Sequence, residues 1–321
     1  MNKFIKRLVY FALPLVIISY PLDLWISDCI SESSCIGYCS DEFSVWDDIF
    51  DGKIDSDIAV YGSSRAWMHF DTPMMTDSLG HNSYNFGMNG NGFLTQYLRH
   101  KMYLKHNRKP KVIMLSVDYF TLEKRDHIIN HFQFLPYMLW NKDMMEETSS
   151  YSDFEIFDFL IPLLRYIGDF QLFVDTYQIT SSDLKSKRDR GFAGISKGWY
   201  EGIEETKEVY HFEIDEKLVQ LLDKFLQECV EDDIEVVLVY APIYYEGLKR
   251  IGNQEEIFNT FYDFSIKYNL EFLDYLDYEI NCHKFLFVDF PHLNDRGAYF
   301  FTSALIEDFQ RTKALKRLKR E

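Results

Sequence analysis

The sequence predicts an α/β protein built on a parallel sheet of about five strands, with helices on both faces, as in three-layer flavodoxin-like folds. Two observations support this prediction. Short apolar runs of strand length recur along the chain, and amphipathic helical patterns lie between or after them. The composition agrees, because 47% hydrophobic and 26% charged residues are typical of a globular protein and exclude global disorder.

The expected strands are continuous apolar runs, which is typical of strands buried on both faces. The first run ends in Gly-Ser-Ser-Arg and the fourth in Ala-Pro, and such sequences commonly form turns. The expected strands lie at 57–61, 83–86, 111–117, 234–240 and 271–275. Helical spacing of apolar residues predicts helices at 93–106, 215–231, 254–268 and 295–311.

Residues 1–27 have the pattern of an export signal or a membrane anchor. Lys3, Lys6 and Arg7 precede an apolar run at 8–26, although Asp23 shortens its uncharged part. No small-x-small cleavage site follows the run, so we expect an uncleaved single-pass anchor with the remainder of the chain outside the cytoplasm. A cleaved signal and a buried helix of a soluble protein are the alternatives.

A polar, acidic connector is expected at 28–55, before the α/β domain at 56–312. The third and fourth strands are separated by more than a hundred residues, far more than a crossover needs. We expect an aromatic-rich insertion at about 119–214 that covers the carboxyl edge of the sheet. Residues 313–321 form a basic tail, which is either a solvated helix end or a contact for a membrane or partner.

Charge and cysteine content limit the function classes. The chain has 34 Lys and Arg against 51 Asp and Glu, a net charge of -17, which argues against nucleic acid as the partner. Three of the five cysteines (Cys29, Cys35 and Cys39) follow the apolar run, and outside the cytoplasm two of them could pair. Their spacing matches no zinc site, and we expect neither a metal nor a cofactor.

The first candidate site is the turn Gly62-Ser63-Ser64-Arg65, which follows the first strand and opens a helix. A serine there lies at the carboxyl edge of the sheet, near helix N–H groups that stabilise developing negative charge. The second candidate is Asp289-Phe-Pro-His292, before the last helix. A serine nucleophile needs a base and the base needs an orienting acid, which His292 and Asp289 can supply. Each motif alone is also an ordinary turn or helix cap.

Together the two motifs resemble the SGNH (GDSL-like) hydrolase superfamily over about residues 56–312. The resemblance implies Ser64 as nucleophile, His292 as base and Asp289 as orienting acid, with the N–H groups of Ser64 and Gly87 in the oxyanion hole. The N-terminal run, the long insertion and the D-x-x-H-L-N-x-x-G ending look most like the membrane-anchored branch. That branch includes the alginate acetylation proteins and the D-alanyl transfer protein of teichoic acid synthesis.

The third conserved block of that family departs from its pattern here. Where the family has G-x-N-D, this chain has Leu115-Ser-Val-Asp118, and a carboxylate cannot donate to an oxyanion. We expect Asn89, or Asn91 near it, to act as a substitute donor, and Asp118 to contact substrate. Arg65 either contacts an anionic group of the substrate or caps its turn locally. His127 and His131 are four residues apart, as in helical metal sites, but no third ligand is evident.

The resemblance implies an envelope-anchored serine esterase or O-acyltransferase that acts on acyl esters of a cell-surface polysaccharide. The aromatic residues of the insertion are candidates for sugar stacking. The alternative is a non-catalytic or weakly catalytic partner of a multi-pass membrane O-acyltransferase.

Overall fold

The computed structural model describes residues 3–32, 41–167, 188–202 and 208–319. The chain forms two compact units. The first comprises Met1–Asp47 and Asp126–Lys187, and the second comprises Asp48–Arg125 and Arg188–Glu321. The expected insertion at 119–214 therefore contributes residues to both units.

The second unit contains a five-stranded sheet in the order β2-β1-β3-β4-β5, with every neighbouring pair parallel. The α/β fold and the five parallel strands are as predicted. In this order β1 lies between β2 and β3, so the chain leaves the carboxyl end of β1 where the strand order reverses, a position that favours ligand sites. The strands are β1 (Ile58–Tyr61), β2 (Ser83–Asn85), β3 (Val112–Ser116), β4 (Glu235–Tyr240) and β5 (Glu271–Asp274).

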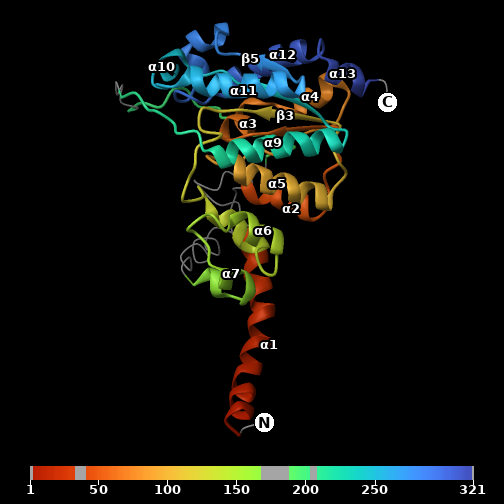
Figure 1. Cartoon of the computed structure of the whole chain (residues 1–321), viewed down its shortest axis with the longest axis vertical. Coiled ribbons are helices and arrows are strands. Elements are labelled where there is room, and N and C mark those ends of the chain that lie inside the picture. The colour runs from red at the N-terminus through yellow and green to blue at the C-terminus, as the bar shows by residue number, and fades with distance from the viewer. Residues whose placement is uncertain (1–2, 33–40, 168–187, 203–207, 320–321) are drawn as a thin grey trace. The chain divides into compact units, whose positions relative to one another are not determined.

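Helices cover both faces of the sheet (Figure 1). The four predicted helices are present as α5 (Phe93–His106), α9 (Glu216–Glu231), α11 (Gln254–Tyr268) and α12 (Asp295–Phe309). Further short helices, which the spacing of apolar residues did not predict, are α3 (Ser64–His69), α4 (Thr72–Leu79), α10 (Tyr245–Leu248), α13 (Lys313–Leu318), η3 (Glu279–Cys282) and η4 (Lys284–Leu286). Of these, α3 was expected only as the helix opened by the serine motif.

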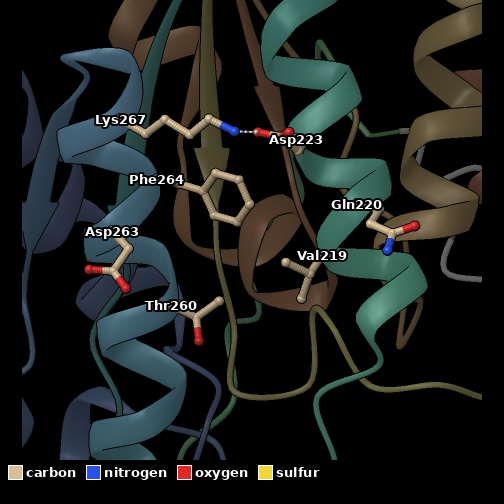
Figure 2. Close-up of a pocket in the computed structure, with 7 residues that line it drawn as sticks. All are labelled: Val219, Gln220, Asp223, Thr260, Asp263, Phe264 and Lys267. Carbon is tan, nitrogen blue, oxygen red and sulfur yellow. Dashed lines mark hydrogen bonds and ion pairs between the residues drawn. The ribbon is translucent and has the colours of Figure 1, made fainter.

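Two of the long helices, α9 and α11, lie side by side and leave a groove of about 350 Å³ between them (Figure 2). Across one end of this groove, Nζ of Lys267 on α11 donates a hydrogen bond to Oδ1 of Asp223 on α9, at a distance of 2.5 Å. The lining contains none of the residues predicted to act in the site.

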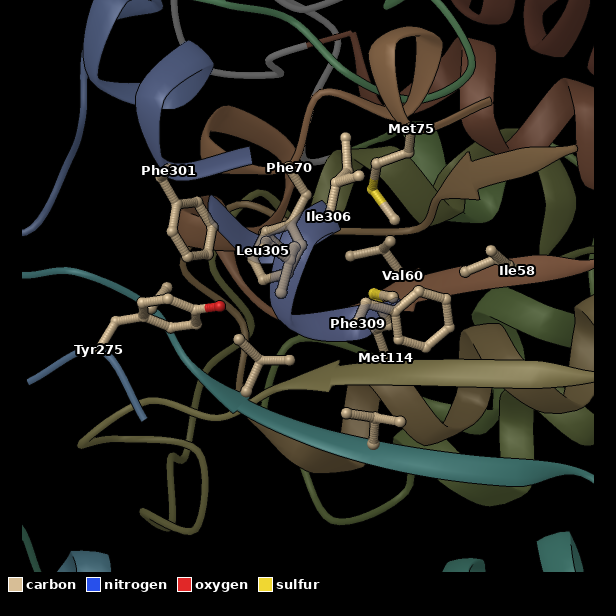
Figure 3. Packing of buried hydrophobic residues seen from close by; sticks show 14 of the residues in the cluster. Ile58, Val60, Phe70, Met75, Met114, Tyr275, Phe301, Leu305, Ile306 and Phe309 are labelled. Atoms are coloured by element: carbon tan, nitrogen blue, oxygen red, sulfur yellow. The ribbon is translucent and has the colours of Figure 1, made fainter. Parts of the chain in front are cut away.

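The main hydrophobic core lies on the other face of the sheet, beneath α3, α4 and α12 (Figure 3). Alternate residues of β1, β3 and β4 point into it, such as Ile58 and Val60 from β1. Phe301, Leu305 and Phe309 of α12 meet them at the four-residue spacing of one helix face. The core thereby fixes α12 against the sheet.

The first unit is largely helical in its described residues. It contains α1 (Lys3–Glu32), most of α2 (Glu42–Phe50), η1 (His131–Tyr137), α6 (Lys142–Thr148), α7 (Ile156–Leu160) and η2 (Leu164–Tyr166). We expected only a polar connector where α2 lies. The segment is instead a helix with an apolar, buried face, because Phe43, Val45 and Trp46 of α2 are fully buried.

Asp23, the acid that interrupts the N-terminal apolar run, is buried in α1 and paired with Arg165. Two guanidinium nitrogens donate to its carboxylate at 2.8 and 2.7 Å, and the N–H of Leu163 donates at 2.6 Å. We expected this region to contain a membrane-spanning helix. Within the described residues, no helix combines the length and apolarity needed to cross a bilayer.

The cysteines beyond α1 are only partly described. Cys35 and Cys39 lie outside the described residues, so their pairing stays a prediction. Cys29, Cys229 and Cys282 are free thiols.

Candidate active site

The turn after β1 brings Ser64 to the carboxyl edge of the sheet. Gly62 has φ 148°, and a Cβ there would lie 2.8 Å from the Cβ atoms of Ala66 and Ser116. A glycine is therefore required for α3 to begin so close to β3. Ser63 is the N-cap of α3, and its Oγ accepts the N–H of Arg65 at 3.2 Å. Ser64 is the first helical residue.

Ser64, His292 and Asp289 form a continuous hydrogen-bonded set, although 228 residues separate the first two. The Oγ of Ser64 lies 2.8 Å from Nε2 of His292. The other ring nitrogen, Nδ1, lies 2.8 and 2.9 Å from the two oxygens of Asp289. Asp289 also accepts the backbone N–H of His292 at 2.9 Å, which holds the loop in a tight turn. The serine is nearly buried, whereas the side chains of His292 and Asp289 are 22% and 29% exposed.

His69, which the sequence did not suggest, supports the loop that carries His292. Its Nε2 accepts the backbone N–H of Leu293 at 3.0 Å. Burial, together with the nearby charge of Arg65 and His292, lowers the pKa of His69 well below its usual range. The ring is therefore neutral near pH 7 and can act as an acceptor.

Gly87 approaches α3 very closely, but its N–H is already engaged. It donates to Oδ1 of Asn85 at 2.9 Å, so this geometry does not offer the free oxyanion donor that we expected. A Cβ at position 87 would lie 2.5 Å from the backbone nitrogen of Trp67, and close packing accounts for the glycine. The amide of Asn85 in turn donates to the carbonyls of Ala66 and Phe70, 2.8 and 3.1 Å away.

Two other groups are candidate hydrogen-bond donors to the oxyanion: the N–H of Ser64 and the side chain of Asn89. The N–H of Ser64, at the start of α3, has no acceptor in the part of the chain that the structure describes, as is usual for the first turn of a helix. Asn89 is half-buried, and its carbonyl accepts from the side chain of Asn91 at 2.8 Å. This contact lies within the loop, and the donor role of Asn89 stays a prediction.

Arg65 and Asp118 are fully buried beneath the serine and paired with each other. Asp118 also accepts from the hydroxyl of Ser63, and Arg65 donates to the carbonyls of Ala241 and Pro242, after β4. Side chains with no solvent exposure lie below any surface that a substrate would touch, so the substrate contacts expected of both residues do not fit this position. They join the ends of β1, β3 and β4 instead.

No group of three or more metal-ligating side chains occurs within the described ranges. Both candidate histidines lie near the carboxylate of Asp153. Nδ1 of His127 lies 3.2 Å from Asp153, and Nδ1 of His131 lies 4.0 Å from the same oxygen. His127 is 72% exposed, as expected of a solvated side chain.

Fold and site together define a class of protein: a parallel α/β sheet with a Ser–His–Asp set at its carboxyl edge. No protein-family model matches the chain, and no curated protein matches it. Among solved structures, a candidate platelet activating factor from Streptococcus pneumonia aligns with TM-score 0.41 and 12% identity, over 84% of this chain and 90% of that one.

The acetyl xylan esterase AlAXEase aligns with TM-score 0.40 and 14% identity, over 78% of this chain and 98% of its own. A candidate acylhydrolase from Bacteroides fragilis NCTC 9343 aligns with TM-score 0.36 and 10% identity, over 79% and 88%. Similarity at this level establishes neither a family nor an activity for this chain.

Proposed function

We propose that this protein is a serine-dependent acyl-ester hydrolase or O-acyltransferase of the SGNH type. The observation that carries the proposal is the 2.8 Å contact between Ser64 Oγ and His292 Nε2, with Asp289 on the opposite side of the ring. A nucleophile, a base and an orienting acid in that order are what acyl transfer requires.

In the first half of the reaction, Ser64 Oγ attacks the ester carbonyl carbon while its proton passes to Nε2 of His292. Asp289, hydrogen-bonded to Nδ1, stabilises the imidazolium that forms. The N–H of Ser64 faces the developing oxyanion. Collapse of the tetrahedral intermediate breaks the ester C–O bond, and the leaving alcohol takes the proton from His292.

In the second half, the acyl-serine reacts with water or with a sugar hydroxyl. His292 removes the proton of that attacking group, and Ser64 leaves with the proton returned by Nε2. Water as acceptor gives hydrolysis, and a glycan hydroxyl gives O-acyl transfer. The polysaccharide acceptor rests on the family resemblance of the sequence.

Turnover of p-nitrophenyl acetate tests the nucleophile. We expect Ser64→Ala to lose activity by at least about 10³-fold and to lose labelling by a fluorophosphonate. Ser303→Ala, a change of the same kind on α12, is the control and should retain both. Equal turnover by wild type and Ser64→Ala, with no labelling of either, would remove Ser64 from the reaction.

The second proposal is that the chain serves as a partner of a multi-pass membrane O-acyltransferase. The engaged N–H of Gly87 and the acid at position 118 favour it, because both reduce the supply of oxyanion donors. Capture of such a membrane protein equally by wild type and Ser64→Ala, with normal envelope acylation in the variant, would support this role. An acylation defect in Ser64→Ala at normal protein levels would contradict it.

We also propose that the chain is held at the outer face of a membrane by its N-terminal segment. The basic residues Lys3, Lys6 and Arg7 ahead of an apolar run support this. Fractionation of cells and protease accessibility of the second unit provide the test. A chain released with the soluble fraction would contradict it.

A further inference from the structure

One surface of the first unit consists of large apolar side chains that are exposed to solvent. It belongs to α7 and the residues that follow it, from 156 to 167. Every exposed residue of this segment is apolar, and those on α7 or next to it are between 47% and 56% exposed. A group of this kind on a protein surface marks a contact with a partner or a membrane. We define the α7 apolar surface as Ile156, Phe157, Leu160, Ile161 and Ile167.

The two charged residues of the same segment do not interrupt this surface. Arg165 is buried. Asp158 is partly exposed, and its carboxylate accepts the backbone N–H of Glu155 at 2.8 Å, which closes the capping box at the start of α7. Both charges are therefore engaged in contacts within the first unit.

Polar contacts fasten this segment to α1. Arg165 donates two hydrogen bonds to Asp23, and Oγ of Ser27 lies 2.7 Å from the hydroxyl of Tyr166. Arg165 and Tyr166 belong to η2, which packs against α7 in turn. The α7 apolar surface is therefore held near the end of the apolar run of α1.

That part of α1 is apolar on more than one side. Asp23 is the only charged residue between positions 8 and 27, and it is buried in its pair with Arg165. Ile17 and Ile18 are both exposed, and consecutive residues of an α-helix point about 100° apart. A partner helix usually covers one stripe of side chains, whereas lipid surrounds a helix.

Aromatic rings and acids mark the end of this apolar region. Trp140 stacks on Tyr20 of α1 with centroids 4.9 Å apart, and both side chains are exposed. The indole N–H of Trp140 donates to the carbonyl of Leu160 at 3.2 Å. Aromatic rings with a polar end are typical of the membrane–water interface. Exposed charge returns on α1 at Asp28 and Glu32, just beyond this level.

We propose that the α7 apolar surface lies in the outer interface of a lipid bilayer, beside the point where α1 leaves it. The proposal rests on the membrane attachment proposed above and adds the insertion to it as a second point of contact. Lipid fits better than a protein partner, because apolar side chains face several directions and no exposed charge fixes an orientation. The pair of Asp23 and Arg165 serves this placement, since the insertion supplies the counterion for the one acid of the apolar run.

Photocrosslinking from position 157 distinguishes lipid from protein. The full-length chain, with benzoylphenylalanine in place of Phe157, is irradiated in phosphatidylcholine vesicles and in membranes of the expressing cells, and adducts are identified by mass spectrometry. We expect a phospholipid adduct in both, with a yield that added salt does not change, because the contact is apolar. The matched control carries the probe in place of Phe285, which is 62% exposed but lies beside the exposed Lys284, and it should give no lipid adduct.

Acidic substitutions beside the probe should remove the adduct. Leu160→Asp with Ile161→Asp places two charges on the surface, and the lipid adduct from position 157 should fall by at least about tenfold, because charge is excluded from lipid. Both side chains are exposed, so the fold should be retained, which circular dichroism checks. Tyr299→Asp with Phe300→Asp, two exposed positions on α12, is the control and should leave the yield unchanged.

An adduct from position 157 to another protein, or to the chain itself, in place of lipid would overturn the proposal and assign the surface to a protein contact. An unchanged lipid adduct in the folded Leu160→Asp, Ile161→Asp variant would overturn it as well. Failure of the attachment is separate: a chain that does not sediment with vesicles contradicts both proposals. A chain that sediments with vesicles but gives no lipid adduct from position 157 contradicts only the contact of α7.

Discussion

At the scale of single residues, the buried pair of Arg65 and Asp118 holds the serine between two fixed neighbours. Ser63 and Arg65 flank the nucleophile, and both donate to Asp118 at the end of β3. A buried guanidinium is tolerated only with a charged partner, because desolvation of an unpaired charge costs several kcal/mol. The pair therefore ties the position of Ser64 to the stability of the sheet edge.

We expect Asp118→Asn to lower the free energy of unfolding by about 3–5 kcal/mol, because Arg65 keeps its charge without a buried counterion. Ester turnover per folded molecule should fall as well, with KM little changed, because Ser64 loses its fixed position. Chemical denaturation and kinetics on the folded fraction measure the two effects. Ser116→Ala, at the last residue of β3 and fully buried, should change neither by much. Normal turnover in folded Asp118→Asn would show that the pair does not position the serine.

Two buried histidines predict a loss of stability in acid. Burial lowers the pKa of His100 to about 3 and that of His69 well below 6.5. Between pH 6.5 and about 3 the unfolded chain binds a proton at position 100 that the folded chain does not, so stability falls as pH falls. The lowered pKa of His69 acts in the same direction below pH 6.5. His100 contributes a slope of about 1.4 kcal/mol per pH unit within that window.

Denaturation between pH 7 and pH 4 measures this slope. His100→Asn should lower by about one the number of protons that the chain takes up on unfolding, and the slope should fall accordingly. The exposed His127 provides the matched control, since His127→Asn should leave the slope unchanged. A slope that is the same in His100→Asn and wild type would exclude His100 as a source of the acid sensitivity.

At the scale of elements, the turn from β1 into α3 depends on Gly62. We expect Gly62→Ala to destabilise the second unit by about 2 kcal/mol or more, because the backbone is strained for an L-residue and the new Cβ meets β3. It should also reduce labelling of Ser64 by a fluorophosphonate. Gly198→Ala is the control, since a Cβ there meets nothing within 4 Å. Unchanged labelling in Gly62→Ala would mean that the turn can relax without moving the serine.

The strands and long helices were predictable because each is encoded locally. Strands buried on both faces appear as short apolar runs, and α9 and α11 show helical spacing over several turns. By contrast, α2 has only nine residues and several acids, and its stability comes from packing of Trp46 in the first unit. The roles of Gly87 and Asp118 were misjudged for a related reason: family blocks do not show which polar groups are already paired.

At the scale of the whole molecule, the excess of acidic residues imposes mutual repulsion on the folded chain. A net charge of -17 destabilises the compact state, and salt screens that repulsion. We expect Tm to rise by about 2 °C or more between 10 and 200 mM NaCl, as about 1 kcal/mol would produce in a chain of this size. Calorimetry measures the change, and the same concentration of sucrose is the control. A fall in Tm with NaCl would mean that specific ion pairs outweigh the repulsion.

The location of the aromatic residues also concerns the whole molecule. Seventeen per cent of the residues are Phe, Trp or Tyr, and the sequence suggested that those of the insertion face a substrate cleft. Several of them, such as Phe134 and Phe159, are buried within the first unit instead. Trp199, by contrast, packs against Tyr244 and Phe290, which lie outside the insertion.

The sequence by itself determined the parallel α/β fold, the order of its strands along the chain and the motifs that hold Ser64, Asp289 and His292. These follow from local patterns of apolar residues and turns, which a single chain displays directly. Only the tertiary structure decided that Arg65 and Asp118 are buried partners, and that the N–H of Gly87 is engaged. Pairing and burial depend on residues that lie far apart in the chain, and their distances are set only when the sheet and helices pack.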